Sequence, residues 1–214
     1  MNAVLHYIYD PLCGWCYGAE PLAWAAAKVD GLTLRLHAGA LWPQPTRLPE
    51  GTRRYIQQAD QRIAQMSGQP FGAPYLTGLL LDPTMVLDSR PVIAAVLAAQ
   101  SLDPAKTLPM LRGIQHAHYE LGKHVVQEAT LLDIAAEVGL DRAAFAAAYR
   151  SVPVDEHIAA SRELMNNIGA QGFPAFALEI DGEWSAVPHG RFASAPAQFG
   201  EWLDGQLRAR SRTH

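Results

Sequence analysis

Cysteine is nearly absent from this chain: two of its 214 residues are cysteines. A scaffold stabilised by many disulfides is therefore excluded. A structural zinc site usually takes two close cysteine pairs, or one pair and two histidines at short spacing. No second cysteine pair exists, and the histidines at 116, 118 and 124 lie far along the sequence from the first pair. We expect His6 and His37, which fall on predicted strands, to be satisfied core or edge residues. We therefore expect no metal.

Long apolar runs and an excess of positive charge are also lacking. The apolar stretch at residues 92–99 is too short to cross a membrane, and the formal net charge of −4 argues against nucleic acid as the main partner. The N-terminus has no basic region followed by a long apolar stretch and a small-residue cleavage site. We therefore expect a cytoplasmic protein. In that reducing compartment, a close cysteine pair is more often catalytic or metal-binding than structural.

The two cysteines form one tetrapeptide, Cys13-Gly14-Trp15-Cys16, at the start of a predicted helix. Thiols at this spacing can form and break a disulfide reversibly, and the free N–H groups and positive dipole end of a helix favour thiolate over thiol. We interpret Cys13 as the attacking thiol and Cys16, one turn further in, as the resolving thiol. A zinc site, an inert buried pair and a static disulfide are the alternatives.

The hydrophobic pattern predicts a βαβ unit at the N-terminus. Residues 4–9 and 32–37 have the apolar and β-branched character of strands, and a helix from about Cys13 connects them. The cysteine pair then lies at the carboxyl end of the first strand, where open α/β sheets place their sites.

A block of helices follows, and the strand pattern returns near the C-terminus. Between residues 50 and 150 the pattern is helical, with predicted helix starts at Ser89, Thr130 and Asp141. After residue 155 come a helix, a strand at 175–180, an Asp181-Gly182 hairpin turn, a strand at 184–187 and a last helix. The predicted order is βαβ, helical block, αββα.

Several segments together resemble the DsbA family of thioredoxin-fold proteins, specifically its cytoplasmic FrnE-like branch. They are residues 10–17 (DPLCGWCY), Pro21, 68–72 (GQPFG), 88–91 (DSRP), 118–122 (HYELG) and the Gly172-Phe173-Pro174 turn. The resemblance implies an α/β protein with a thioredoxin-like fold and a large all-helical insertion between the βαβ and αββα halves. Residues 1–45 and 155–214 would form the discontinuous thioredoxin-like domain, and residues 46–154 the insertion.

The resemblance also implies roles for residues outside the cysteine pair. Pro174 corresponds to the family's cis-proline beside the disulfide, and Phe173 before it would offer backbone groups to an extended substrate. Glu20 matches an acidic residue near the buried thiol and could relay a proton to or from Cys16. Leu12, Gly14 and Trp15 complete the expected substrate contacts. Gly14 replaces the proline often found there, and Phe173 replaces a smaller residue.

These observations predict a thiol–disulfide oxidoreductase of the protein disulfide reductase or isomerase type. It would need no tightly bound cofactor, act on thiols or disulfides of proteins or peptides, use glutathione as a redox partner or co-substrate, and be a monomer or a homodimer. One alternative is a glutathione-dependent small-molecule enzyme like the kappa-class transferases and hydroxychromene-carboxylate isomerases, which characteristically have serine in place of the first cysteine. A second is a non-redox binding module.

Overall fold

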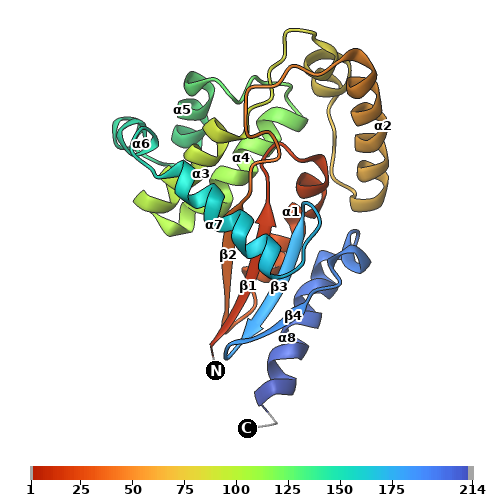
Figure 1. Cartoon of the computed structure of the whole chain (residues 1–214), viewed down its shortest axis with the longest axis vertical. Helices are drawn as coiled ribbons and strands as arrows, with labels where there is room; N and C mark the ends of the chain where they lie inside the picture. The colour runs from red at the N-terminus through yellow and green to blue at the C-terminus, as the bar shows by residue number, and fades with distance from the viewer. Residues whose placement is uncertain (1, 212–214) are drawn as a thin grey trace.

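A mixed four-stranded sheet with the order β2-β1-β3-β4 occupies one end of the molecule (Figure 1). The computed structural model describes residues 2–211. The central strand β1 (Ala3–Tyr9) is buried along its whole length, because it lies between parallel β2 (Leu32–Ala38) and antiparallel β3 (Ala175–Ile180). At the edge, β4 (Glu183–Ala186) pairs with β3 through the predicted Asp181-Gly182 turn, in which both residues have positive φ.

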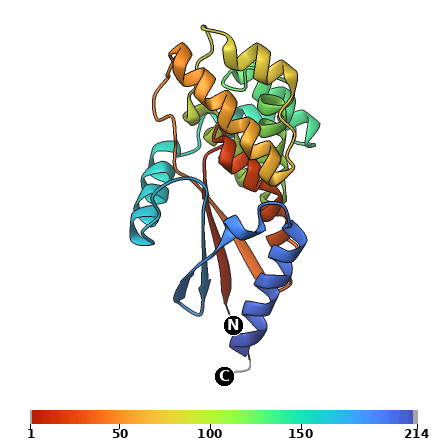
Figure 2. The same ribbon diagram turned by 90° about the vertical axis from the view of Figure 1, so that its right-hand side faces the viewer.

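Helices fill the chain between β2 and β3 and also cover the sheet. Helix α1 (Gly14–Ala26) connects β1 to β2, and α8 (Pro196–Ser211) follows β4. Figure 2 shows α7 and α8 on opposite sides of the sheet. Between β2 and β3 lie α2 (Glu50–Ser67), α3 (Ser89–Leu102), α4 (Thr107–Tyr119), α5 (Glu128–Glu137), α6 (Arg142–Tyr149) and α7 (Val154–Asn167), with short helical turns at Pro74–Gly78, Leu79–Leu81 and Pro104–Lys106 and, after β4, at His189–Phe192.

This order of elements confirms the predicted α/β fold with an all-helical insertion between its two halves. The domain bounds of 1–45, 46–154 and 155–214 stay a prediction. Among residues 2–211, no helix combines the length and apolarity that a membrane span requires.

Helix α3 begins at Ser89 as predicted, but Ser89 is not its N-cap, and the predicted start of α5 was wrong by two residues. The N-cap of α3 is Asp88, whose carboxylate accepts the Arg90 N–H at 3.0 Å. The neighbouring Ser89 is instead the first helical residue, because its buried hydroxyl accepts the N–H of Trp42 at 2.9 Å. Helix α5 begins at Glu128 rather than Thr130. Asp141 caps α6 as predicted and accepts the Ala144 N–H at 2.8 Å.

The strand histidines pair with each other inside the fold. His6 Nδ1 lies 3.0 Å from His37 Nε2, and His6 Nε2 lies 3.0 Å from Glu179 Oε2. A neutral His6 that donates to Glu179 therefore accepts a hydrogen bond from His37. Burial lowers the pKa of His6 and lowers the pKa of His37 to about 4, with the charge of His6 as a second cause for His37. His6 is therefore a satisfied core residue, and His37 is a half-buried residue of the edge strand β2.

Stability is expected to fall in acid through His37. The unfolded chain binds a proton at His37 near its ordinary pKa of about 6.5, whereas the folded chain does so only near 4. The contribution of His37 is therefore present above pH 6.5 and is lost as pH falls toward 4. When the pH is lowered from about 7.5 to 5, the unfolding free energy should fall in both proteins. We expect this fall to be about 1–2 kcal/mol smaller in His37→Asn than in the wild type. Urea unfolding at both pH values measures the difference, and equal losses would contradict it.

Candidate active site

The cysteine pair sits where β1 passes into α1. Cys13 is the N-cap residue of α1, and its N–H donates to the carbonyl of Asp10 at 3.2 Å. Cys16 follows in the first helical turn. Neither sulfur is bridged, and Cys13 is 5% exposed while Cys16 is 0% exposed. Cys13 is thus the outer sulfur of the pair and lies at a helix N-terminus.

Cys16 is held in a fully buried position behind Cys13. Its Sγ accepts the N–H of Asp10 at 3.5 Å. Burial raises the pKa of Cys16 well above its ordinary value, the neighbouring Cys13 raises it further, and the Asp10 N–H opposes the shift. Cys16 therefore stays a thiol while Cys13 reacts, as a resolving cysteine must.

Asp10 fixes the turn that leads into the cysteine pair, a role that sequence reasoning did not assign. Its buried carboxylate accepts the N–H of Leu12 and the N–H of Leu41, both at 2.7 Å. Burial raises the pKa of Asp10, and these hydrogen bonds oppose the rise. The carboxylate thereby joins the turn at residues 10–12 to the loop that follows β2.

Phe173 presents its backbone to Cys13 and its ring to the opposite side. The Phe173–Pro174 peptide bond is cis, and the Phe173 carbonyl oxygen lies 3.9 Å from Cys13 Sγ. The ring packs on Gly39, where an added Cβ would lie 2.6 Å from it, and its centre is 5.1 Å from the guanidinium of Arg162. Arg162 also donates to the carbonyls of Gly39 and Ala40. The ring of Phe173 therefore packs on Gly39 and Arg162, while its carbonyl oxygen lies next to Cys13.

A cavity of about 150 Å³ opens beside Cys13. Residues 12–15 form one side of it, and the roles of Leu12, Gly14 and Trp15 as substrate contacts stay a prediction. Leu12 is buried, whereas Trp15 is 43% exposed and stands at the edge of the cavity. The other side comes from the insertion, including Asp60, Tyr75, His118 and Tyr119. The insertion thus supplies most of the residues that line the cavity.

An aromatic cluster joins α1 to the insertion behind this cavity. Tyr119 stacks on Tyr17 with ring centres 4.7 Å apart and meets Phe71 and Tyr75 edge-on at 5.3 and 5.1 Å. His118 packs edge-on against Tyr119 at 4.7 Å. These contacts fix the wall of the cavity relative to the cysteines, since aromatic rings supply large buried area and geometric specificity.

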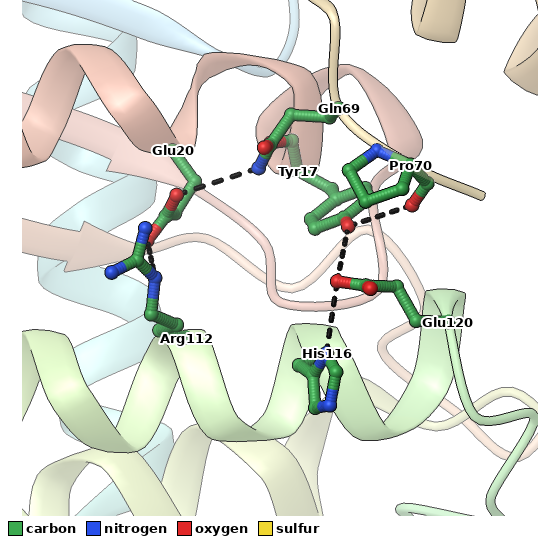
Figure 3. Close-up of polar contacts among 7 residues, drawn as sticks. All are labelled: Tyr17, Glu20, Gln69, Pro70, Arg112, His116 and Glu120. Carbon is green, nitrogen blue, oxygen red and sulfur yellow. Dashed lines mark hydrogen bonds and ion pairs between the residues drawn. The ribbon is translucent and has the colours of Figure 1, made fainter. Parts of the chain in front are cut away.

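Glu20 points from α1 toward α4 (Figure 3). Arg112 Nε lies 2.9 Å from Glu20 Oε1, and Gln69 Nε2 lies 3.4 Å from Oε2. The side chain is 2% exposed, so burial raises the pKa of Glu20, against the effect of Arg112. Among residues 2–211, no hydrogen bond joins this carboxyl group to a cysteine sulfur. Glu20 connects α1 to α4, and its role as a proton relay stays a prediction.

Tyr17 makes a second connection between α1 and α4 (Figure 3). Its hydroxyl lies 2.8 Å from the carbonyl oxygen of Pro70 and 2.9 Å from Glu120 Oε1, and His116 Nδ1 is 2.9 Å from the same carboxylate oxygen. Burial and Glu120 raise the pKa of Tyr17, so its hydroxyl remains a donor. Sequence reasoning did not find Tyr17, Asp60 or Arg162. No group of three or more potential metal ligands occurs in the stretch that the structure describes.

Comparison with known proteins identifies the family. A model of the DSBA-like thioredoxin domain matches residues 4–195. The chain belongs to this family. The predicted DsbA-family resemblance is therefore confirmed, and with it the thioredoxin-like fold. No curated protein sequence matches the chain.

Solved structures include close relatives of this DSBA-like chain. The cytosolic disulfide reductase DsbM from Pseudomonas aeruginosa is 48% identical, with a TM-score of 0.88 over 96% of this chain and 99% of that chain. A structure of the same reductase with GSH matches at 46% identity and a TM-score of 0.86, with the same coverage. A 2-hydroxychromene-2-carboxylate isomerase, 16% identical with a TM-score of 0.61 over 98% of both chains, shares the fold alone.

Proposed function

We propose that this DSBA-like protein is a thiol–disulfide oxidoreductase that reduces or isomerises disulfides of proteins or peptides through Cys13 and Cys16. The observation that carries the proposal is the position of Cys13. It lies at a helix N-terminus beside an open cavity, 3.9 Å from the Phe173 carbonyl, with the buried thiol of Cys16 one turn behind it. The similarity to a cytosolic disulfide reductase over almost the whole chain supports the same chemistry.

The arrangement fits a two-step exchange. The Cys13 thiolate attacks one sulfur of the substrate disulfide, the substrate S–S bond breaks, and the second substrate sulfur leaves as a thiolate. Cys16 then loses its proton and attacks the Cys13 sulfur, which releases the first substrate sulfur as a thiolate. The two electrons pass from the enzyme dithiol to the substrate, whose two thiolates take up two protons. The reverse sequence oxidises a dithiol.

Glutathione is the proposed partner that returns the enzyme disulfide to the dithiol. The structure of the related reductase with GSH supports this proposal, and two molecules of the tripeptide thiol supply the two electrons. A cytoplasmic location, where glutathione keeps thiols reduced, fits the same direction of reaction. A monomer or a homodimer is compatible with it.

A glutathione-dependent isomerase or transferase is the second candidate, because an isomerase shares the fold. Those enzymes characteristically carry serine at the first cysteine position, whereas Cys13 and Cys16 are both present here. A buried resolving thiol has no use in a reaction that only positions glutathione. The buried position of Cys16 therefore favours disulfide exchange over this alternative. A non-redox binding module would have no use for a buried resolving thiol either.

A redox titration tests the proposed function. The protein is equilibrated in graded glutathione buffers, and the free thiols of Cys13 and Cys16 are counted by alkylation and mass. We expect a two-electron transition with a midpoint between about −270 and −120 mV. A pair that never closes, or never opens, across this range would overturn the assignment.

Glu20 is proposed to relay the proton of Cys16, and Glu20→Gln tests it. We expect the resolving step to slow by about tenfold or more at neutral pH, because an amide cannot accept the proton. Stopped-flow decay of a mixed disulfide between Cys13 and a chromophoric thiol measures this step. An unchanged rate together with a lower melting temperature would instead leave Glu20 as a link between α1 and α4.

A further inference from the structure

A carboxyl group of the insertion lies directly against the cysteine motif. A Cβ atom added to Gly14 would lie 2.3 Å from Oδ1 of Asp60 on α2, which is far too close for non-bonded atoms. The carboxyl therefore occupies the space that a side chain at position 14 would fill. Cys13, Gly14 and Asp60 line the same cavity.

Asp60 is buried without the partners that stabilise the other buried carboxylates. Asp60 is 2% exposed, and its Oδ2 accepts a hydrogen bond from the Tyr75 hydroxyl at 2.7 Å. Asp10 has two backbone N–H donors, and Glu20 has Arg112. No ion pair to Asp60 is found within residues 2–211. Burial raises the pKa of Asp60 to about 7, and the hydrogen bond from Tyr75 opposes this shift.

Four titratable side chains near Asp60 keep one charge state near neutral pH. From the turn at residues 74–78, Tyr75 has its pKa raised well above its ordinary value, and from α4 the same holds for Tyr119. His118, also on α4, has its pKa lowered to about 3 by burial. From α1, Cys16 has its pKa raised. Among these five groups, Asp60 is the one whose pKa lies near 7.

We propose that Asp60, whose carboxyl lies against the cysteine motif in the cavity beside Cys13, is a specificity-determining residue that selects by charge which disulfides Cys13 accepts. The inference rests on the proposed role of Cys13 as the attacking sulfur. Uncharged Asp60 leaves the cavity open to substrates of any charge. Ionised Asp60 repels a carboxylate near the substrate sulfur, so neutral and cationic disulfides are favoured.

Two alkylating reagents of the same chemistry but different charge test this inference. Neutral iodoacetamide and anionic iodoacetate both react with the Cys13 thiolate. The ratio of the iodoacetamide rate constant to the iodoacetate rate constant is therefore independent of how much thiolate is present. Rates are measured by mass spectrometry in the Cys16→Ser background, between about pH 5.5 and pH 8.5. We expect the ratio to rise about three- to tenfold through an inflection near pH 7, as a negative charge appears beside the sulfur.

Three variants separate this effect from structural changes. Asp60→Asn is expected to give a constant ratio, and Tyr75→Phe to move the inflection to higher pH, because the hydrogen bond that favours the carboxylate is lost. Glu50→Gln makes the same charge change at an exposed position on α2 and is expected to match the wild type. Should Asp60→Asn fail to fold, the shift in Tyr75→Phe remains decisive.

A ratio that stays flat in the Cys16→Ser protein that retains Asp60, or that rises equally after Asp60→Asn in the same background, would overturn the inference. Reduction of a neutral disulfide by the wild type is measured in parallel. If the wild type reduces the disulfide but the alkylation ratio is flat, the role of Asp60 is rejected and the proposed function stands. A rising ratio without any turnover rejects the proposed function and keeps the charge effect of Asp60.

Discussion

Cys13→Ser is expected to abolish disulfide reduction, lowering turnover by at least about a thousandfold, because a serine hydroxyl at neutral pH is a poor nucleophile and cannot form the mixed disulfide. The surrounding fold should be unaffected, since serine is close to cysteine in size and the Cys13 N–H still donates to the carbonyl of Asp10. Steady-state reduction of a peptide disulfide by the variant, with glutathione as the electron source, measures the loss.

Cys16→Ser is the matched variant, with the same atom exchanged one helical turn away. It should keep the attack by Cys13 but accumulate the mixed disulfide, which mass spectrometry detects as one substrate chain bound to the protein. The two variants thus fail at different steps. Full activity of Cys13→Ser would favour a glutathione-dependent isomerase or transferase instead, and unchanged substrate binding without redox turnover would favour a binding module.

Tyr119→Ala is expected to cost about 3–5 kcal/mol of unfolding free energy, as for other large aromatic residues removed from a core. Tyr119 is 1% exposed and lies at the centre of the ring cluster that holds the insertion against α1. Its loss also removes part of the wall beside Cys13. We therefore expect Cys13 alkylation to change along with stability. Urea unfolding and the alkylation rate, measured below the unfolding transition, give the two quantities.

Phe199→Ala is the control for that variant. Phe199 is 0% exposed and packs against Phe176 and Phe192, with ring centres at 5.7 and 5.5 Å, on the α8 side of the sheet. It should cost about as much stability, within the same 3–5 kcal/mol range, but leave Cys13 alkylation unchanged. Equal effects of both variants on alkylation would show that the aromatic cluster has no special relation to the site.

The strands and the cysteine helix were predictable because each has a strong local signal. The apolar run of β1, the alternation in β2 and the Asp181-Gly182 turn all act within a few residues. Helix starts were less certain, since Asp88 and Ser89 are both good N-caps and the choice depends on a distant partner, the Trp42 N–H. Local sequence does not contain that information.

The contribution of the insertion to the site was harder to predict. Helix α2 is rich in polar residues, so Asp60 resembles a solvated acid. One signal was present: Asp60 lies four residues after Ile56 and three before Ile63, on the apolar stripe of the helix. Arg162 offered no such signal, because its role arises only when α7 meets the loop after β2.

The contact between Gly14 and Asp60 limits how this enzyme could be re-engineered. Exchanging the two residues between the cysteines is an obvious way to retune a redox enzyme, since the surroundings of the thiols set their potential. Here a Cβ atom at the first of those positions would lie 2.3 Å from Oδ1 of Asp60, so the buried Asp60 side chain would have to move. A transplanted dipeptide with a side chain at this position would need either a displaced Asp60 carboxyl or a smaller side chain at position 60. The cysteine motif and α2 must therefore be redesigned together.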